Sequence, residues 1–331
     1  MPSRTLETIL YSLKKIVPRS VFRLFQPPYH YALAYVSALV YRFPSKEITV
    51  IGVTGTKGKS SVTEILNALF EADGKRTAVL GTIRIKLGEH SEPNLFKMTM
   101  PGRFFVQKFL RDAVRAGCDI AILEMTSEGA KQFRHKFIHL DALVFTNLSP
   151  EHIESHGSFE KYLGAKLMIK EELERSQKRP RFIIANKDDE YGPRFLNAQV
   201  ERILPYGLSD LALYNLNKDD LSLVIDGITI RVPLIGLFNV YNCLAALTTA
   251  RAFGVPLRTI DRALSSLPPI HGRVELFRSP KHAERKITVV VDYAHTPDSL
   301  EKLYKAFEKE IKIGVLGNTG GGRDTWKRPE M

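Results

Sequence analysis

A glycine-rich segment that follows an apolar run and precedes an amphipathic run is the strongest constraint on the fold of this chain. Residues 48–66 read ITVIGVTGTKGKSSVTEIL, so β-branched residues come first, glycines interrupt them, and apolar residues return at helical spacing. This order predicts a buried strand, a tight turn and a helix, where backbone N–H groups and the positive end of the helix dipole can surround a phosphate. We expect Lys59 to reach the outer phosphates of a nucleotide and the Ser60 hydroxyl to hold Mg²⁺.

The spacing of these glycines is a variant of the common pattern. The loop reads G-x-x-G-x-x-G-K-S-S, whereas the usual phosphate loop is G-x-x-x-x-G-K-[ST]. An ordinary glycine turn capped by Ser60 or Ser61 is the alternative. The segment GVTGTKGKSS resembles the nucleotide loop of the Mur ligase family, whose members use ATP to join amino acids to cell-wall precursors. The resemblance implies that the loop residues in contact with nucleotide are Gly55, Thr56, Lys57, Gly58, Lys59, Ser60 and Ser61.

Composition and charge favour a globular chain with an anionic partner. The 331 residues are 44% hydrophobic and 25% charged, which is enough for two domains and a substantial core. The net charge of +12 suits a nucleotide, a sugar-phosphate, a membrane surface or nucleic acid, and charge alone does not choose among them. No aromatic-basic ribbon or nucleic-acid motif is present, so we expect no nucleic-acid partner. Cys118 and Cys243 are far apart in apolar surroundings, which favours the reducing cytoplasm over a disulfide framework or a zinc site.

Residues 1–46 predict a basic helical segment. Apolar residues recur at helical spacing over 6–17, and residues 29–43 form an apolar stretch too short to span a bilayer comfortably. Pro27 and Pro28 precede that stretch, so we expect a helix to begin after them. Seven basic residues and one acidic residue lie before position 47. The segment is either a helical pair packed on the next domain or an amphipathic segment that rests on a membrane surface. We see no secretory signal.

The rest of the chain predicts an α/β fold. Strand-like and helix-like stretches alternate up to Tyr206, which indicates a parallel sheet flanked by helices. Residues 211–232 change to short alternating strands with Asp226-Gly227 as a hairpin turn, which predicts a small antiparallel insert. Strands are expected at 78–81, 119–125, 141–148, 181–186 and 201–207, and helices at 103–116, 159–175 and 189–198.

A carboxylate stands at the end of one predicted strand. Glu124 closes DIAILEM, and open α/β sheets bind ligands at that end of their strands. A carboxylate there can bind a metal or orient a nucleophile, although many such residues are simply solvated. The segment LEMTSEG resembles the E-[VM]-[ST]-S segment of the Mur ligase family, which implies a metal-binding role for Glu124. Glu128 occupies a position where the tripeptide-synthetase branch of the family usually has His, so no role is assigned to it.

The window FTNLSPEHIESHGSFEKYLGAKLMIK, residues 145–170, is the richest in polar side chains. A loop with Glu151 and two histidines follows the strand, and a helix begins near Ser158 with Glu160 as a capping-box partner. The histidines and the carboxylate could suggest zinc, but no thiol or third histidine accompanies them.

This window also resembles the run FTNL-x-x-[DE]-H-x-x-x-HG-x-x-x-x-Y-x-x-A-K of the Mur ligase family. The resemblance implies that Asn147 contacts the nucleotide, that His152 is a ligand of a second Mg²⁺, and that Lys166 is carbamylated. A carbamate replaces the ammonium, which repels a metal, by an anion with two oxygen ligands.

Later segments resemble family positions around the nucleotide. Residues 186–189, NKDD, match N-x-D-D, and the G-x-F-N-x-x-N match implies that Asn239 contacts the adenine end of ATP. Alternatively, Asn239 and Asn242 cap a helix. HGR at 271–273 and VVVDYAHTPDSL imply that Arg273, Asp292 and His295 face the ribose and phosphates. The stretch from 311 predicts a further strand and a glycine-rich loop similar to F-G-x-G-G-x-R-D-x-x-K-R-P-x-M.

The resemblance implies three parts and one reaction. We expect the basic segment 1–46, a central ATPase domain 47–271, and the beginning of a Rossmann-like C-terminal domain at 272–331. The reaction implied is carboxylate activation by ATP to an acyl phosphate, followed by amide formation with an amino acid. The nearest branch acts on a UDP-N-acetylmuramoyl-peptide and carries a UDP-binding N-terminal domain, in place of which this sequence has only the basic segment. We therefore expect a gene fragment in which ligation is impaired. We also expect the protein to be cytoplasmic and monomeric. A folylpolyglutamate or cyanophycin synthetase and a non-catalytic nucleotide-binding module remain as alternatives.

Overall fold

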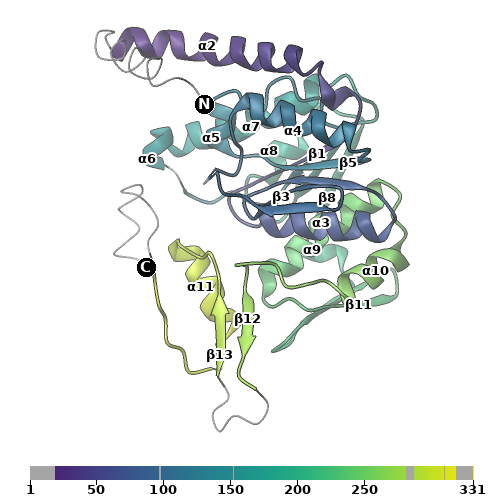
Figure 1. The fold of residues 1–331 in the computed structure, drawn as a ribbon. Helices are drawn as coiled ribbons and strands as arrows, with labels where there is room; N and C mark the ends of the chain where they lie inside the picture. Colours follow the sequence, from purple (N-terminus) through teal and green to yellow (C-terminus); the bar gives the residue numbers. More distant parts are fainter. Residues whose placement is uncertain (1–18, 97, 152, 281–286, 309, 318–330) are drawn as a thin grey trace.

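The computed structural model describes residues 19–331 apart from 97, 152, 281–286, 309 and 318–330, and for 19–24 it describes the backbone alone. Within these residues, an eight-stranded sheet carries helices on both faces (Figure 1). Its order is β4-β3-β2-β5-β1-β6-β7-β8. The neighbouring strands β2, β5, β1, β6, β7 and β8 run parallel to one another. The predicted parallel sheet is therefore confirmed. The bounds are β1 Thr49–Thr54, β2 Thr77–Leu80, β3 Arg84–Leu87, β4 His90–Pro93, β5 Ile120–Glu124, β6 Ala142–Phe145, β7 Phe182–Asn186 and β8 Arg202–Tyr206.

The sheet separates two apolar cores because side chains alternate across each strand. Ile51 and Val53 of β1 pack with α3 and α9 on one face, whereas Val50 packs with α4 and α7 on the other. Strands covered on both faces are apolar at nearly every position, which is why β1 and β5 read as continuous runs. The helices are α2 Arg19–Val40, α3 Lys59–Ala72, α4 Arg103–Arg115, α5 Ser127–Lys131, α6 Ile153–His156, α7 Phe159–Arg175, α8 Gly192–Leu196, α9 Leu237–Ala252, α10 Leu257–Ser265 and α11 Pro297–Ala306, with the 3₁₀ turns η1 Pro44–Lys46 and η2 Leu208–Asp210.

Helix α2 corrects one prediction. It includes Pro27 and Pro28, so the expectation that a helix begins after them is wrong. Proline has a helical φ, but in a helix interior it removes its own N–H from the ladder and its ring crowds the carbonyl four residues earlier. The helix is held on its C-terminal half, where Ala34 and Ala38 are buried next to α4. Residues 1–18 of the predicted basic segment lie outside the described residues. Among the helices that are described, none combines the length and apolar character needed to cross a membrane.

The antiparallel insert is confirmed. Strands β9 Leu213–Leu216, β10 Leu221–Ile225 and β11 Ile228–Val232 form a separate sheet in the order β11-β10-β9. Asp226 and Gly227 both have positive φ, at 49° and 76°, as the predicted two-residue hairpin turn requires. The insert packs beside α10 and extends the core on the α3 side.

The last part of the chain is only partly as predicted. Strands β12 Glu275–Arg278 and β13 Thr288–Val291 form an antiparallel hairpin, and Thr296 caps α11 by accepting the N–H of Ser299. The strand expected from 311 is wrong, because residues 311–317 have no strand and Ile311, Ile313 and Val315 are almost fully exposed. A strand needs a hydrogen-bonded neighbour, and no described strand pairs with this stretch. The glycine-rich loop that follows lies outside the described residues.

Two smaller predictions also need correction, and one feature was missed. The helix expected at 189–198 shortens to α8, because Asp189 accepts the N–H of Tyr191 at 2.9 Å and holds a turn instead. Ser158 caps α7 by accepting the N–H of Lys161, so Glu160 lies one position too early for the expected capping box. The antiparallel edge formed by β3 and β4 was not predicted.

Candidate nucleotide site

The glycine loop between β1 and α3 lies against the end of β6. Gly55 has a φ of 146°, and a Cβ there would lie 1.9 Å from the Thr146 hydroxyl. Gly58 has a φ of 84°, and a Cβ there would lie 2.4 Å from Oδ1 of Asn242. Both positions therefore need glycine for space as well as for backbone conformation. Gly58 is the N-cap of α3 and brings no side chain to that helix end, so backbone N–H groups face the loop.

Two lysines converge on one carbonyl of this loop. Lys59 Nζ donates to the carbonyl oxygens of Gly55 and Thr56, each at 2.9 Å, and Lys166 Nζ donates to that of Gly55 at 2.7 Å. Burial lowers the pKa of Lys59, and burial together with the charge of Lys59 lowers the pKa of Lys166 well below its usual value. Within the described part of the chain, neither lysine forms an ion pair with a carboxylate. An anion at the loop would compensate this charge.

Glu124 and Ser60 meet at the head of α3. Ser60 Oγ donates to Glu124 Oε2 at 3.1 Å, and the same carboxylate accepts the N–H and the hydroxyl of Thr82 at 2.7 and 2.9 Å. Arg273 Nη2 donates to Ser60 Oγ at 3.1 Å and so brings the segment before β12 to the loop. A buried carboxylate beside a hydroxyl is an oxygen donor pair of the kind that Mg²⁺ prefers. The donor set therefore fits a magnesium ion bound together with phosphates.

Asn147 holds the backbone of the loop through hydrogen bonds. Its side-chain amide accepts the N–H of Lys57 at 2.9 Å and donates to the carbonyl of Lys57 at 3.1 Å, while its own carbonyl accepts the N–H of Thr56 at 2.8 Å. The expected contact of this amide with the nucleotide stays a prediction, because both ends of the amide are used by the loop. Thr56 is fixed in a similar way, since its hydroxyl lies 2.8 Å from that of Tyr162.

Glu151 links the loop to the C-terminal part of the chain. Its carboxylate is buried, lies 2.9 Å from Lys57 Nζ and lies 3.2 Å from His295 Nε2. His295 thus approaches the loop through a carboxylate to which no role had been assigned, and its expected contact with the ribose and phosphates stays a prediction. His152, the predicted ligand of the second metal, lies outside the described residues.

The remaining predicted residues make local contacts. Asn239 Nδ2 donates to the carbonyl of Ile235, and its Oδ1 accepts from Asn242, so neither amide caps α9 and the capping alternative is wrong. Asp292 accepts the N–H groups of Val274 and Ala294 and so shapes the turns beside the β12–β13 hairpin. Ser61 is buried within the first turn of α3. The expected contacts of Asn239, Asp292 and Ser61 with nucleotide stay predictions.

Sequence reasoning missed some contributors to the site. Thr82, which provides two of the hydrogen bonds to Glu124, follows β2 without any local signal. The contacts of His156 were also missed, since its Nε2 lies 3.2 Å from Ser127 Oγ and 3.3 Å from Glu128 Oε1. Among the described side chains, no three of His, Cys, Asp and Glu lie close enough to hold a metal ion by themselves.

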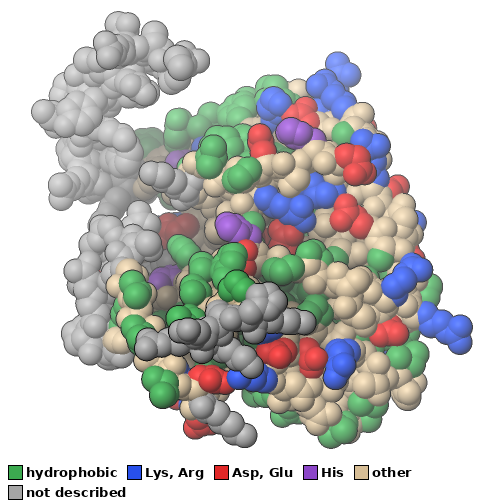
Figure 2. All heavy atoms as spheres, turned by 60° about the horizontal axis from the view of Figure 1, so that its bottom comes forward, with side chains coloured by type: hydrophobic (Ala, Val, Ile, Leu, Met, Phe, Trp, Pro, Cys, Tyr) green, Lys and Arg blue, Asp and Glu red, His purple; other side chains and the backbone are tan. Residues whose placement is uncertain are grey.

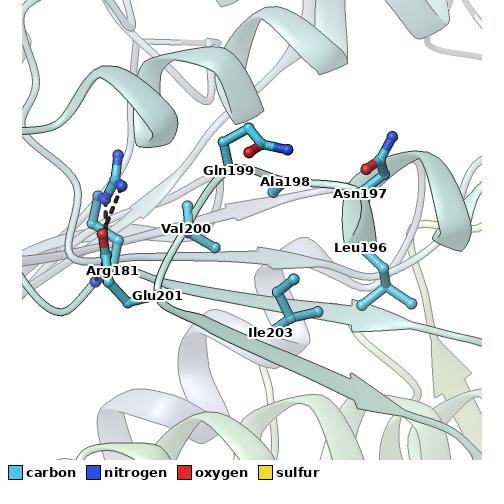
Figure 3. Close-up of a pocket in the computed structure, with 8 residues that line it drawn as sticks. All are labelled: Arg181, Leu196, Asn197, Ala198, Gln199, Val200, Glu201 and Ile203. Atoms are coloured by element: carbon cyan, nitrogen blue, oxygen red, sulfur yellow. Dashed lines mark hydrogen bonds and ion pairs between the residues drawn. The ribbon is translucent and has the colours of Figure 1, made fainter.

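A surface hollow of about 600 Å³ lies elsewhere. It is found at the outer edge of β8 and is lined by residues 196–200, Ile203 and the ion pair of Arg181 with Glu201 (Figure 3). None of the predicted site residues lines it. On the face shown in Figure 2, Lys and Arg side chains are interspersed with Asp and Glu and do not form one basic field. The loop, and not this hollow, is therefore the candidate site.

A family model, the Mur ligase middle domain, matches residues 53–250 of the chain. The chain belongs to the Mur ligase family. This Mur ligase chain is 34% identical over 313 residues to the UDP-N-acetylmuramoyl-L-alanyl-D-glutamate--2,6-diaminopimelate ligase of Bacillus licheniformis, and 36% identical over 313 residues to that of Bacillus velezensis. Each alignment covers 91% of this chain and 63% of the relative, so the chain spans about three fifths of the length of these curated relatives.

Solved structures agree with the fold of this Mur ligase chain. A diaminopimelate ligase of the same description superimposes with a TM-score of 0.65 at 29% identity, covering 86% of this chain and 59% of that one. The folylpolyglutamate synthase of Mycobacterium tuberculosis, solved with ADP and AMPPCP, gives a TM-score of 0.66 at 17% identity, covering 85% of this chain and 71% of that one. The second likeness shows the fold alone.

Gly55 provides a test of the loop. We expect Gly55→Ala to weaken ATP binding by about tenfold or more, because the added methyl group displaces the loop from Thr146 and from the backbone of Asn147. Gly74→Ala is the matched control, since Gly74 has a φ of 79° but no atom within 4 Å of an added Cβ. Titration with a fluorescent ATP analogue measures both variants, and equal affinities would contradict a nucleotide site at this loop.

Proposed function

We propose that this chain is the ATP-using part of a ligase that joins an amino acid to a UDP-N-acetylmuramoyl-peptide. The observation that carries the proposal is the convergence of Lys59, Lys166 and the Ser60–Glu124 pair on one glycine loop. The similarity to diaminopimelate ligases supports the substrate class. Because about two fifths of each relative has no counterpart here, the whole reaction is part of the proposal.

The residues at the loop suit phosphoryl transfer from ATP to a carboxylate. Lys59 would exchange the carbonyl oxygens of Gly55 and Thr56 for the outer phosphates, and Arg273 would add a second positive charge beside Ser60. Ser60 and Glu124 would hold Mg²⁺, which supplies neutralisation of phosphate charge when it is bound. The side chains mainly position reactants and offset charge, and the acyl phosphate formed would then be attacked by the amino group of the amino acid.

We also propose a second magnesium site with a carbamate on Lys166. Lys166 is 2% exposed and its pKa is well below its usual value, so its amine is available as the neutral nucleophile that CO₂ requires. The carbamate would place a negative charge beside Lys59, whose charge lowers the pKa of Lys166. By the family resemblance, His152, which lies outside the described residues, would be a ligand of this second magnesium ion.

The wider assignments are proposals of the same kind. They comprise nucleotide contacts from Thr56, Lys57, Gly58, Ser61, Asn147, Asn239, Asp292 and His295, the division at 46–47 and 271–272, a monomeric state and a cytoplasmic location. Folylpolyglutamate synthesis is the competing activity, because the folylpolyglutamate synthase structure has the same fold.

Peripheral contact with an anionic membrane surface is proposed for α2. Its exposed face carries Phe25, Tyr29, Val36, Leu39 and Val40 at helical spacing, each between 43% and 64% exposed. Residues 24–41 contain no Lys, Arg, Asp or Glu. A hollow of about 360 Å³ at the end of this face is lined by Val40, Tyr41, Arg42, Arg111 and Arg115. Arg111 is paired with Glu47, so the apolar face complements acyl chains and Arg42 and Arg115 beside it complement anionic headgroups.

Turnover with defined substrates tests the main proposal. We expect ATP hydrolysis to rise on addition of UDP-N-acetylmuramoyl-dipeptide and an amino acid, and Lys59→Ala to lower it by about a hundredfold or more. Lys75→Ala, at an exposed position beyond α3, is the control. Stimulation by folate in place of the peptide would support the competing activity. Unchanged ATP affinity in Lys59→Ala would contradict the site itself.

Carbon dioxide tests the proposed carbamate. We expect a carbamate signal in ¹³C NMR spectra recorded with ¹³C-bicarbonate, and the signal should grow as pH rises because more of the Lys166 amine is then neutral. Lys166→Ala should abolish the signal, whereas Lys161→Ala, at an exposed position on the same helix, should keep it. A signal that survives Lys166→Ala would show that the carbamate is elsewhere.

Vesicle sedimentation tests the membrane proposal. The chain should bind vesicles of phosphatidylcholine with phosphatidylglycerol more than neutral vesicles, and Val36→Glu with Val40→Glu should reduce binding severalfold by adding charge to the apolar face. Leu213→Glu adds the same charge at an exposed position of the antiparallel insert and should have no effect. Self-association through α2, detected by analytical ultracentrifugation without vesicle binding, would contradict the proposal.

A further inference from the structure

A segment beside the glycine loop is held at both of its ends. We call residues 149–156, between β6 and α7, the connecting segment, of which residue 152 lies outside the described residues. At its first end the N–H of Ser149 donates to the hydroxyl of Thr56 in the glycine loop at 3.0 Å. Between the ends lies Glu151, the carboxylate that links the loop to the C-terminal part of the chain. The place of this carboxylate therefore depends on how the two ends are fixed.

Helix α5 holds the other end of the connecting segment, where the short helix α6 lies beside it (Figure 1). The Ser155 hydroxyl donates to Oε1 of Glu128, and the same oxygen lies 3.3 Å from Nε2 of His156. Lys131, the last residue of α5, donates through Nζ to the carbonyl of Ser155 at 2.7 Å. Two side chains of α5 thus fix the last two residues of the connecting segment.

A line of buried rings leads from this end back to the glycine loop. The side chain of His156 is 2% exposed, and its ring meets that of Tyr162 edge-on, with 5.4 Å between the ring centroids. The Tyr162 hydroxyl lies 2.8 Å from that of Thr56, and Nζ of Lys166 lies 5.0 Å from the centre of the Tyr162 ring. Close packing transmits small shifts between buried neighbours. A displacement of α6 would therefore reach Thr56 and Lys166 through these rings.

The hold of α5 on α6 depends on the charge of Glu128. An ionised carboxylate only accepts hydrogen bonds, so Nε2 of His156 carries a hydrogen and donates it to Glu128. Hydrogen bonds to an ionised carboxylate are about twice as strong as those between neutral groups. The same charge also acts on Arg134, because burial lowers the pKa of Arg134 and the charge of Glu128 raises it. A test of Glu128 must therefore separate its action on α6 from its action on Arg134.

We propose that Glu128 is a positioning residue, which fixes the connecting segment so that Glu151 stays between Lys57 and His295. The inference rests on the proposed function, because it takes the glycine loop as the place where phosphate reacts. In the described part of the chain, Glu128 forms no hydrogen bond or ion pair with Lys57 or His295, so it acts through the segment. The glycine loop keeps its own hydrogen bonds to Asn147, so nucleotide binding does not depend on Glu128.

Histidine NMR of the full chain, without substrates, tests this proposal. The protein is labelled with ¹⁵N-histidine, and His295→Gln identifies the ring signals of His295. We expect Glu128→Gln to shift these signals although the two residues are not in contact, because the Glu151 carboxylate moves with the connecting segment. Glu89→Gln, at an exposed position in the turn between β3 and β4, removes the same charge and should leave them unchanged.

Steady-state kinetics provides a second readout. Glu128→Gln should lower kcat for ATP turnover with the peptide and the amino acid by about fivefold to tenfold, and should leave the KM for ATP unchanged. Glu89→Gln should change neither constant. Lys131→Met, which removes the other contact of α5 from an exposed position, should act in the same direction by a smaller factor. A thermal melt checks that each variant folds.

The outcomes separate this proposal from the proposed function. Unchanged His295 signals in Glu128→Gln would overturn the proposal, and so would an unchanged kcat. Reduced turnover with unchanged His295 signals would place the effect on Arg134 and would overturn it as well. If Glu128→Gln does not fold, the same two measurements on Lys131→Met decide. Absence of ATP turnover in the unmodified protein would instead overturn the proposed function, and the His295 signals would still decide whether Glu128 fixes the connecting segment.

Discussion

The close approach of Gly55 to Thr146 is the constraint on which the site depends. With no side chain at position 55, the end of β1 can lie on the end of β6, and the Gly55 carbonyl then faces Lys59 and Lys166. The same approach allows Thr146 and Asn147 to bind the backbone of Lys57. A larger residue at 55 would move all of these groups together, because they share one short stretch of backbone.

Charge at the loop is arranged for a ligand that brings negative charge. Lys59 and Lys166 are held by carbonyl dipoles, and the nearby carboxylates of Glu124 and Glu151 are used by other partners. Carbonyl dipoles offset only part of the cost of burying an ammonium group. Nucleotide phosphates would provide the remaining compensation, so binding and the relief of this electrostatic cost are the same event.

Much of the fold and the centre of the site could be predicted from the sequence because their signals are local. Apolar runs predicted β1 and β5, which are adjacent and parallel. Ser60 follows β1 and Glu124 ends β5, so the two side chains lie side by side. The use of Asn147 as a support, of Glu151 as a link and of Glu128 to hold α6 depends on contacts between distant segments, for which no periodicity exists. Local rules also failed where packing decides, as in the continuation of α2 through two prolines, and where a partner strand is needed, as at 311–317.

Both outer strands of the central sheet end the hydrogen-bonding ladder with a proline. On one side β4 is four residues long and finishes at Pro93, and on the other side β8 contains Pro205. Proline offers no N–H to an incoming strand, and the neighbouring Glu92 and Arg202 add charge at the two borders. The sheet is thus protected against growth by addition of a strand from another molecule, and this resistance to aggregation follows from the same residues that set its width.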